Sequence, residues 1–214
     1  MSPIFVLASA SITRKKVLEN AGFVIQVRPS NFDESQITVD QPESLVQQLA
    51  IAKAREVAEC YREDSALVIG CDSVMELNGK IYGKPQSIEN AIAQWQMMRG
   101  GKAKIYTGHC LIDTRQQLMR AQVGVTQVYF VNGIESEILS YIHSGEPLNC
   151  AGCFTLEGLG GLLIEKIEGC HTNVLGLSLP ILRQLLRQLG YGIRFSSDRR
   201  VELLSIDACI HPNY

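Results

Sequence analysis

The sequence predicts an α/β fold with a mixed sheet, and two observations support this. Short apolar runs typical of strands alternate with helical patterns, in which apolar residues recur every three or four positions. At two places consecutive strand patterns lie close enough to pair antiparallel: around Asn78-Gly79, and between 104–113 and 122–131. Alternating elements combined with antiparallel hairpins favour a mixed sheet flanked by helices.

The N-terminal part of the chain predicts two strands and two helices. Pro3 to Ala8 is an apolar run, and a helical pattern follows it until Gly22 provides a stop. Val24 to Val27 predicts a second strand, which leads into the polar segment SNFDESQ. A second helix begins near Pro42 and carries an apolar face.

The remaining elements follow from similar signals. The expected strands are 66–69, a run that reaches Asn78-Gly79 and returns to Lys84, 104–113, 122–131 and 162–164. The expected helices are one capped by Ser87 and ended by Gly100-Gly101, one at 135–144 stopped by Gly145, and a last one with Pro180 near its first turn and Gly190 after its end. We expect residues 1–195 to form one domain and residues 196–214 a C-terminal extension.

The turn between the first strand and the first helix contains Ser9, Ser11 and Arg14. A helix start is a ready anion site, because unpaired backbone N–H groups and the helix dipole converge there. Arg14 lies in the first turn, so its side chain points back toward the helix start, where a phosphate would lie. The alternative is that Ser9 and Ser11 only cap the helix and Arg14 extends into water.

Two further charged residues, Glu34 and Lys53, lie at positions where either a functional or an ordinary structural role fits. Glu34 follows the second strand in the polar segment, and acidic residues in loops are usually just solvated. Lys53 interrupts the apolar face of the second helix, four residues after Leu49 and four before Val57. A long lysine often snorkels to water from such a position. The other interpretation is that Lys53 points into a polar cleft beside the core.

The stretch from Gly70 to Pro85, GCDSVMELNGKIYGKP, reads as a hairpin, because Asn-Gly is suited to a two-residue turn in which both residues take positive φ. Counting outward from this turn places Ser73 opposite Lys84 and Asp72 opposite Pro85. A carboxylate and an ammonium would then meet at the open end of the hairpin. The pair would be either catalytic or an ordinary structural salt bridge.

Composition and missing motifs exclude several classes of function. A formal net charge of -2 gives no electrostatic footprint for duplex nucleic acid or an anionic membrane. The cations Arg14, Lys15 and Lys16 follow the first apolar run, the reverse of a signal peptide, and no segment approaches the roughly 18 apolar residues of a membrane span. We therefore expect a cytoplasmic protein. The sequence contains no P-loop, dinucleotide-binding or nucleophile-elbow motif.

The cysteines leave one alternative open. Cys150 and Cys153 form the only C-x-x-C, and a redox or zinc module could be built on them. A closed zinc site needs four ligands, and an adjacent Cys-His pair occurs at Cys170-His171.

Three cations and two carboxylates then remain to be explained: Arg14, Lys53 and Lys84, with Glu34 and Asp72. Carboxylates hold a hard divalent ion and orient a water molecule, whereas lysine and arginine neutralise phosphate charge as a bond breaks. This set of residue types indicates metal-dependent chemistry on a phosphate.

A series of short motifs runs along the chain in a specific order and spacing. They are Ser9-x-Ser11-x-x-Arg14, Glu34 after the second strand, Lys53 in the next helix, Gly70-Cys71-Asp72, Gly83-Lys84-Pro85, Thr107-Gly108, Glu146-Pro147, Ala151-Gly152 and Asn173 to Leu177. With these motifs the chain resembles the Maf family of nucleoside triphosphate pyrophosphatases from about Ile4 to Leu189. It departs from many relatives at Ile12-Thr13, where they have Pro-Arg, and has Glu157-Gly158 where the dTTP/UTP-preferring members have Gln-Gly.

The resemblance implies an elongated α/β sheet in two lobes around a central cleft, the Maf/ITPase-like fold. It also implies hydrolysis of a nucleoside triphosphate to a monophosphate and diphosphate with a divalent metal, Mg²⁺ or Mn²⁺. The implied catalytic residues are Asp72 as base, Glu34 and Lys84, with Asp72 and Glu34 also holding the metal. The implied substrate-binding residues are Ser9, Ser11, Arg14, Lys53 and Glu157.

The resemblance also bears on the substrate. At Glu157, and in the stretch from Pro147 to Gly152, the chain is similar to members that act on 7-methyl-GTP, so modified nucleotides are expected as substrates. The alternatives for Glu157 are that it stabilises its glycine-rich turn or binds metal. The rival function is a nucleotide-binding regulator of cell division or septum formation with little turnover. The expected partners are a nucleoside triphosphate and a second copy of the chain.

Overall fold

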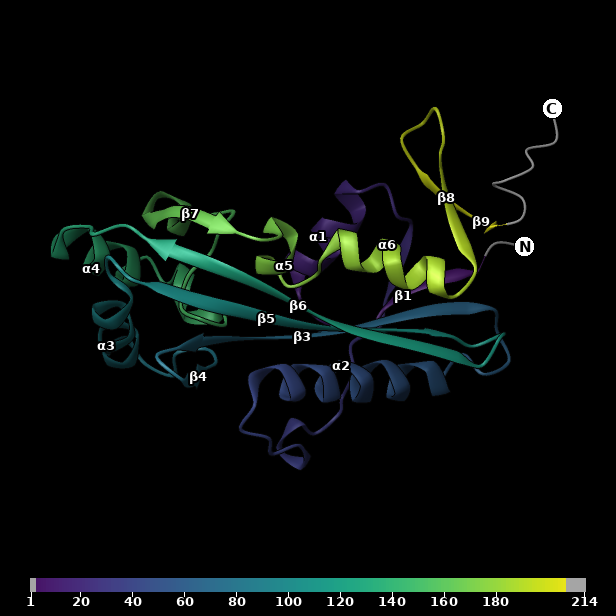
Figure 1. The fold of residues 1–214 in the computed structure, drawn as a ribbon, viewed down its shortest axis with the longest axis horizontal. Helices are drawn as coiled ribbons and strands as arrows, with labels where there is room; N and C mark the ends of the chain where they lie inside the picture. Colours follow the sequence, from purple (N-terminus) through teal and green to yellow (C-terminus); the bar gives the residue numbers. More distant parts are fainter. Residues whose placement is uncertain (1–2, 207–214) are drawn as a thin grey trace.

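Three long antiparallel strands run along the longest axis of the computed structural model, which describes residues 3–206 (Figure 1). They are β3 (Ala66–Leu77), β5 (Lys102–Asp113) and β6 (Leu118–Phe130). They belong to a seven-stranded sheet of order β2-β1-β3-β5-β6-β7, in which β4 also pairs with β3. Its other strands are β1 (Ile4–Leu7), β2 (Ile25–Val27), β4 (Lys80–Tyr82) and β7 (Ile164–Glu168). Only β1 pairs in parallel, with β2 and β3, so the predicted mixed sheet is confirmed.

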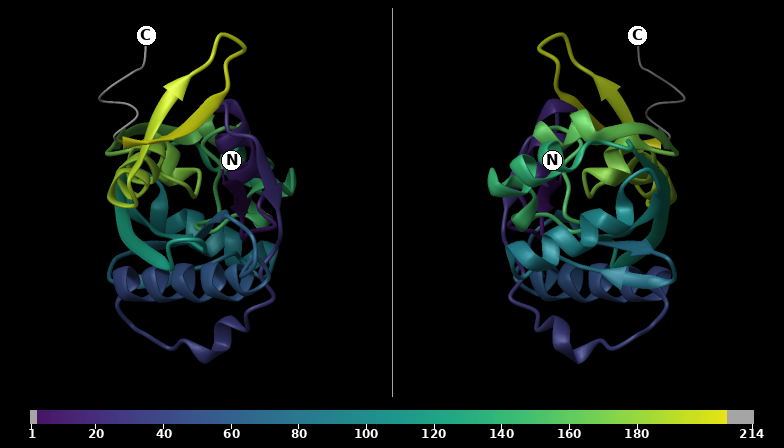
Figure 2. Two further views of the ribbon diagram at one scale, coloured as in Figure 1. Left: turned by 90° about the vertical axis from the view of Figure 1, so that its right-hand side faces the viewer. Right: turned by 90° about the vertical axis from the view of Figure 1, so that its left-hand side faces the viewer.

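Helices cover both faces of this sheet (Figures 1 and 2). Helix α2 (Pro42–Glu59) lies along one face, and α1 (Ile12–Asn20) and α6 (Leu179–Gln188) lie on the other. The opposite end of the sheet carries α3 (Ile88–Met98) and α4 (Glu135–His143). Shorter helical segments are α5 (His171–Val174) and the 3₁₀ turns η1 (Glu34–Gln36), η2 (Glu146–Asn149) and η3 (Leu159–Leu163). Within residues 3–206, no helix combines the length and apolar character of a membrane span.

Two large hydrophobic clusters lie at opposite ends of β3. The first contains Leu67 and Ile69 with side chains from α1 and α6, and the second contains Met75 and Leu77 with side chains from α3 and α4. Asp72 lies on the stretch of β3 between them. The sheet is therefore elongated because it supports two cores, and the polar part of β3 lies where they meet.

Two glycines allow α2 to lie unusually close to the sheet. A Cβ atom on Gly70 would lie 2.4 Å from the carbonyl oxygen of Ala50, and one on Gly108 would lie 2.1 Å from that of Val46. Gly108 is the β5 partner of Asp72. Any larger residue at either position would push α2 away from the sheet at the level of Asp72.

The hairpin after β3 is confirmed at its turn but not at its open end. Asn78 and Gly79 both have positive φ, 52° and 78°, and Leu77 pairs with Lys80 as predicted. The ladder stops at the pair of Met75 and Tyr82, so the predicted pairing of Ser73 with Lys84 and of Asp72 with Pro85 is wrong. The chain leaves the sheet because the carbonyl of Gly83 accepts a hydrogen bond of 3.1 Å from the backbone N–H of Gly152 instead.

Two further differences concern the C-terminal third. The strand expected at 162–164 is displaced, because Leu159–Leu163 forms the 3₁₀ turn η3 and β7 begins at Ile164. The strands β8 (Tyr191–Phe195) and β9 (Val201–Ser205) form a hairpin, and the backbone N–H of Val201 donates to the carbonyl of Gly22. The proposed boundary at residue 195 lies at the turn of this hairpin and stays a prediction. Residues 207–214 of the expected extension lie outside the described residues.

Candidate active site

The candidate site lies at a gap in one edge of the sheet. On that edge β3 pairs with β1 through Ala66–Ile69 and with β4 through Met75–Leu77, whereas β5 covers the other edge along nearly the whole strand. In the described part of the chain, no strand pairs with residues 70–74 on the first edge. The gap is flanked by the end of β1 and the start of α1 on one side, and by the loop after β4 on the other.

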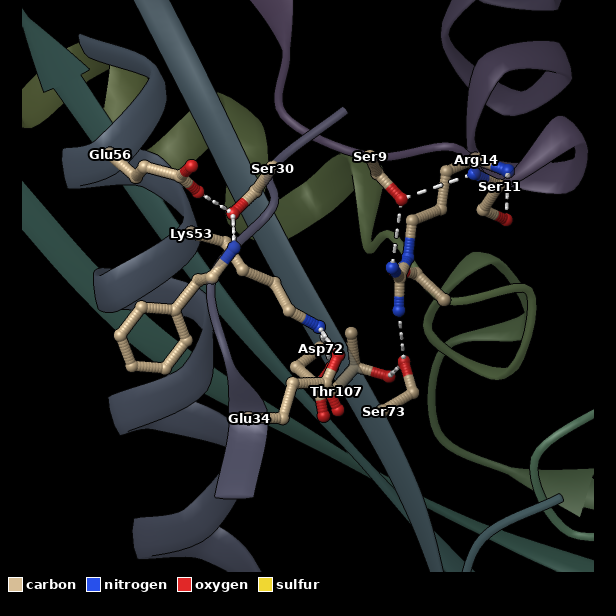
Figure 3. Close-up of polar contacts among 12 residues, drawn as sticks. Ser9, Ser11, Arg14, Ser30, Glu34, Lys53, Glu56, Asp72, Ser73 and Thr107 are labelled. Carbon is tan, nitrogen blue, oxygen red and sulfur yellow. Dashed lines mark hydrogen bonds and ion pairs between the residues drawn. The ribbon is translucent and has the colours of Figure 1, made fainter. Parts of the chain in front are cut away.

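A carboxylate cluster lies on the α2 side of this gap (Figure 3). Lys53 Nζ, from α2, is 2.5 Å from Asp72 Oδ1 and 2.6 Å from Glu34 Oε1. The Lys53 and Asp72 side chains are only 13% and 12% exposed, whereas Glu34 is 57% exposed. Lys53 therefore does not snorkel to water. It forms a largely buried ion pair with Asp72, and Glu34 closes that pair from the solvent side.

An arginine cluster lies on the other side of the same strand. Because successive side chains of a strand point to opposite faces, Ser73 faces away from Asp72. Arg14 donates from Nη2 to Ser73 Oγ at 3.1 Å, from Nη1 to Ser9 Oγ at 3.2 Å and from Nε to the Gly176 carbonyl at 2.8 Å. Figure 3 shows the two clusters on either side of β3. The gap is thus lined by a carboxylate from one face and a guanidinium from the other.

The guanidinium of Arg14 is fixed in place by neutral groups. Its acceptors are hydroxyl and carbonyl oxygens, and within residues 3–206 no carboxylate pairs with it. Gly176 has φ of 93°, and a Cβ there would lie 3.0 Å from Arg14 Nε, so glycine permits the contact. Ser11 caps α1 by accepting from the Arg14 backbone N–H, as the capping alternative predicts, but Arg14 does not extend into water.

Lys84 is not part of either cluster. It is exposed, and the described residues provide it with no hydrogen bond or ion pair, so the expected contact with Asp72 is wrong and Lys53 takes that place. Lys84 and Tyr82 line a cavity of about 300 Å³ between the loop after β4 and α3, together with Gln94. Burial raises the pKa of the Cys150 thiol, the charges of Glu157 and Glu146 raise it further, and Lys84 lowers it.

Glu157 faces the first turn of α1 across the gap. Its Oε1 accepts a hydrogen bond of 2.9 Å from Thr13 Oγ1, one residue before Arg14. The segment that carries Glu157 is held by the carboxylate of Glu146, which accepts from the backbone N–H groups of Leu159 and Gly160 at 3.1 Å each and from the Thr155 hydroxyl. The structure thus places Glu157 beside the arginine cluster and assigns Glu146 a supporting role.

The donor set for a metal is incomplete in the protein alone. Within the described residues, no group of three or more His, Cys, Asp or Glu side chains could hold a metal ion, which leaves Cys150 and Cys153 without further zinc ligands there. Asp72 and Glu34 share the ammonium of Lys53 and so lie near one another. Two carboxylates suit Mg²⁺, which is usually bound by one or two carboxylates together with waters and substrate phosphates.

Sequence reasoning missed several residues that shape the site. Ser73 and Thr107 form a hydroxyl pair at 2.9 Å, and Thr107 donates to the carbonyl of Asn173, which ties β3 and β5 to α5. Thr107 and Gly176 belong to recognised motifs, but a motif does not reveal which contact it makes. The sequence marked Thr13 only as a departure from the family pattern and Ser73 only as a hairpin position, and neither observation revealed the contacts with Glu157 and Arg14.

The chain is similar to known proteins over most of its length. The model of the family described as Maf-like protein matches residues 4–189. A nucleoside triphosphate pyrophosphatase of Rippkaea orientalis is 53% identical over 199 residues, which cover 93% of this chain and 96% of that protein. Similar proteins of the same name are found in Synechocystis sp., 53% identical with 91% and 98% covered, and in Nostoc punctiforme, 51% identical with 89% and 96% covered.

Proposed function

The chain belongs to the Maf-like protein family, and we infer from this membership that it is a nucleoside triphosphate pyrophosphatase, a hydrolase. The reaction adds one water to a nucleoside triphosphate and yields a nucleoside monophosphate and diphosphate. The relatives that carry this name share about half of their residues with the chain over almost its whole length.

One observation carries our assignment of the site. Arg14 offers a fixed guanidinium that has no carboxylate partner in the described chain, and it is anchored to Ser73 on β3. The residue before Ser73 on that strand is Asp72, which offers a carboxylate. If a triphosphate binds at the gap in the sheet, its phosphates would contact the guanidinium of Arg14, and the bond to be cleaved would lie beside the carboxylate of Asp72. Ser9 and Ser11 would add hydroxyl and backbone donors at the start of α1.

We assign the base to Asp72. Water attacks the phosphorus that stays with the nucleoside, its proton passes to the Asp72 carboxylate, and diphosphate leaves with the bridging oxygen. Lys53 orients this carboxylate and places a positive charge beside the reacting phosphates. Lys84, which is exposed and forms no ion pair within residues 3–206, would complete the neutralisation of phosphate charge from the other side of the gap.

Asp72 and Glu34 would hold the divalent metal, Mg²⁺ or Mn²⁺. Such an ion supplies positive charge that stabilises the leaving phosphate oxygens. Both carboxylates contact the ammonium of Lys53, and this shared contact supports assigning the metal to them.

We assign Glu157 to the nucleobase and propose 7-methyl-GTP as a better substrate than dTTP or UTP. A carboxylate accepts hydrogen bonds and donates none. Guanine presents two adjacent donors that one carboxylate can accept together, and 7-methylation adds positive charge to its ring. Uracil and thymine present one donor between two acceptors, so a carboxylate would face two oxygens of like polarity.

A panel of nucleotides tests this assignment. The protein is incubated with 7-methyl-GTP, GTP, dTTP and UTP in the presence of Mg²⁺ or Mn²⁺, and the release of diphosphate is measured. We expect the protein to release diphosphate, and the rate of release to be highest with 7-methyl-GTP. Faster hydrolysis of dTTP or UTP would overturn the substrate assignment alone. Nucleotide binding without diphosphate release would overturn the hydrolase and favour the regulator of cell division.

Cytoplasmic location and assembly into a homodimer remain proposals. The first rests on the composition of the chain, and the second on the family resemblance alone. Light scattering of the purified protein measures the oligomeric state directly, and a mass near the 23.7 kDa of one chain would contradict the dimer.

A further inference from the structure

A hydrogen bond crosses the gap between two segments that are far apart in the sequence. Thr13 Oγ1, in the first turn of α1, donates to Glu157 Oε1 at 2.9 Å, and 144 positions separate the two residues. The two side chains are polar and at least partly exposed, so water could satisfy both of them. The bond therefore needs an explanation other than the pairing of buried groups.

Both ends of this bond are fixed in place. On the α1 side, Ser11 caps the helix and Arg14 is anchored to the carbonyl of Gly176. On the other side, the Glu146 carboxylate accepts from the Thr155 hydroxyl before Gly158 and from the backbone N–H groups of Leu159 and Gly160 after it. A Cβ on Gly158 would lie 2.5 Å from this carboxylate, so the segment packs tightly against it. Because other contacts hold both segments, the hydrogen bond from Thr13 determines the direction in which the Glu157 carboxylate points.

The charges around Glu157 explain why its direction matters. Within residues 3–206, Glu157 forms no ion pair. Its hydrogen-bond partner Thr13 directly precedes Arg14, which is proposed to bind phosphate. A carboxylate that rotated toward the triphosphate would repel it. The Thr13 bond uses one lone pair of Oε1 and leaves one on Oε1 and two on Oε2, enough for two donors of a nucleobase.

We propose that Thr13 is a positioning residue for base discrimination, holding the Glu157 carboxylate so that its oxygens face the paired N–H donors of a guanine-type base. This inference rests on the proposed role of Glu157 in meeting the base. The substrate class that it favours is a purine nucleoside triphosphate with two adjacent donors on its pairing edge.

The experiment is a double-mutant cycle with a rescue variant. Thr13→Val removes the donor and keeps the shape, Thr13→Ser keeps the donor, and Glu157→Gln removes the carboxylate. For each variant and for Thr13→Val with Glu157→Gln, kcat/KM is measured for 7-methyl-GTP, GTP, UTP and dTTP. Ser205→Ala, the loss of an exposed hydroxyl in β9, serves as the control.

We expect Thr13→Val to lower the ratio of kcat/KM for guanine over pyrimidine nucleotides by about threefold to tenfold, the effect of one lost hydrogen bond. The loss should appear mainly in the KM for guanine nucleotides. Thr13→Ser should restore the ratio, and Thr13→Val should have little further effect once Glu157→Gln is present.

Several outcomes would overturn the inference. An equal loss for all four nucleotides would mean that Thr13 only supports the fold, and additive effects of the two substitutions would mean that Thr13 does not act through Glu157. If the wild-type protein releases diphosphate from none of the nucleotides, the proposed hydrolase fails. The same cycle is then measured by calorimetric binding of GTP and UTP, where unchanged selectivity in Thr13→Val would refute the role of Thr13 independently.

Discussion

Lys53 on α2 and Asp72 on β3 form an ion pair of 2.5 Å, and both side chains are largely withdrawn from water. They meet because Gly70 and Gly108 let α2 approach the sheet closely at this level. The pair replaces the contact of Asp72 with Lys84 that the hairpin register predicts. It makes the site depend on how a helix packs against the sheet, and it gives the first two predictions below.

Asp72→Asn is expected to fold and to lose turnover by roughly 100-fold to 10,000-fold, because an amide cannot take a proton from water. The amide oxygen can still accept a hydrogen bond from Lys53, so the fold should be kept. Steady-state diphosphate release measures the effect. Glu76→Gln, the same change four residues along β3, is the control, since its amide can still accept from the Gly79 N–H. Equal activities of the two variants would remove Asp72 from the mechanism.

Lys53→Met is expected to lower the free energy of unfolding by about 3 kcal/mol, because it leaves the buried carboxylate of Asp72 beside Glu34 without a cation. The KM for nucleotide should rise as well. Urea unfolding and steady-state kinetics measure the two effects, and Lys53→Arg, which keeps the charge, should lose less stability. Unchanged stability in Lys53→Met would show that the pair contributes nothing and that the apolar face of α2 tolerates methionine.

Glu146→Gln is expected to loosen the segment that carries Glu157. Burial acts to raise the pKa of Glu146, but hydrogen bonds from Thr155, Leu159, Gly160 and Tyr141 outweigh it, so the folded-state pKa lies below the ordinary 4.5. The stabilisation is therefore present above pH 4.5 and is lost as the pH falls through the folded-state pKa.

The variant should lose about 1–2 kcal/mol of unfolding free energy at pH 7, less at pH 3, and its KM for nucleotide should rise. Urea unfolding at the two pH values measures this, with Glu165→Gln on the exposed part of β7 as the control. A pH-independent difference between Glu146→Gln and the wild type would contradict the assignment.

His109 is expected to make the protein less stable in mild acid. Burial lowers its pKa from 6.5 to about 4, and its Nε2 accepts from the backbone N–H of Ser178 at the start of α6. Between pH 6.5 and 4 the unfolded chain therefore binds a proton that the folded protein does not, and the free energy of unfolding falls as the pH drops.

The loss between pH 7.5 and 5 should be about 2 kcal/mol from this residue. His109→Gln, which can still accept from Ser178, should flatten this part of the pH profile. Chemical unfolding at several pH values measures it, and His143→Gln, at an exposed position of α4, is the control. Parallel profiles of wild type and His109→Gln would show that His109 does not cause the acid sensitivity.

The order of elements and the class of fold could be predicted from the sequence because they depend on local signals. Ser87 caps α3 by accepting from the Asn90 N–H, and Asn78-Gly79 makes the turn that its positive φ angles allow. The strand expected at 162–164 was misplaced by a similar local argument, because glycine-rich apolar runs suit a 3₁₀ turn as well as a strand.

Arg14, Lys53, Asp72 and Glu34 are predicted to act on a phosphate from the sequence alone, because residue type and motif spacing can be read along the chain. Their partners follow only from the tertiary fold. Contacts such as Lys53 with Asp72, or Thr13 with Glu157, join segments whose approach depends on packing between distant elements, and the chain carries no local signal for that. Hydrogen bonding within a turn is set by neighbouring residues, whereas the distance between a helix and a sheet is set by every side chain between them.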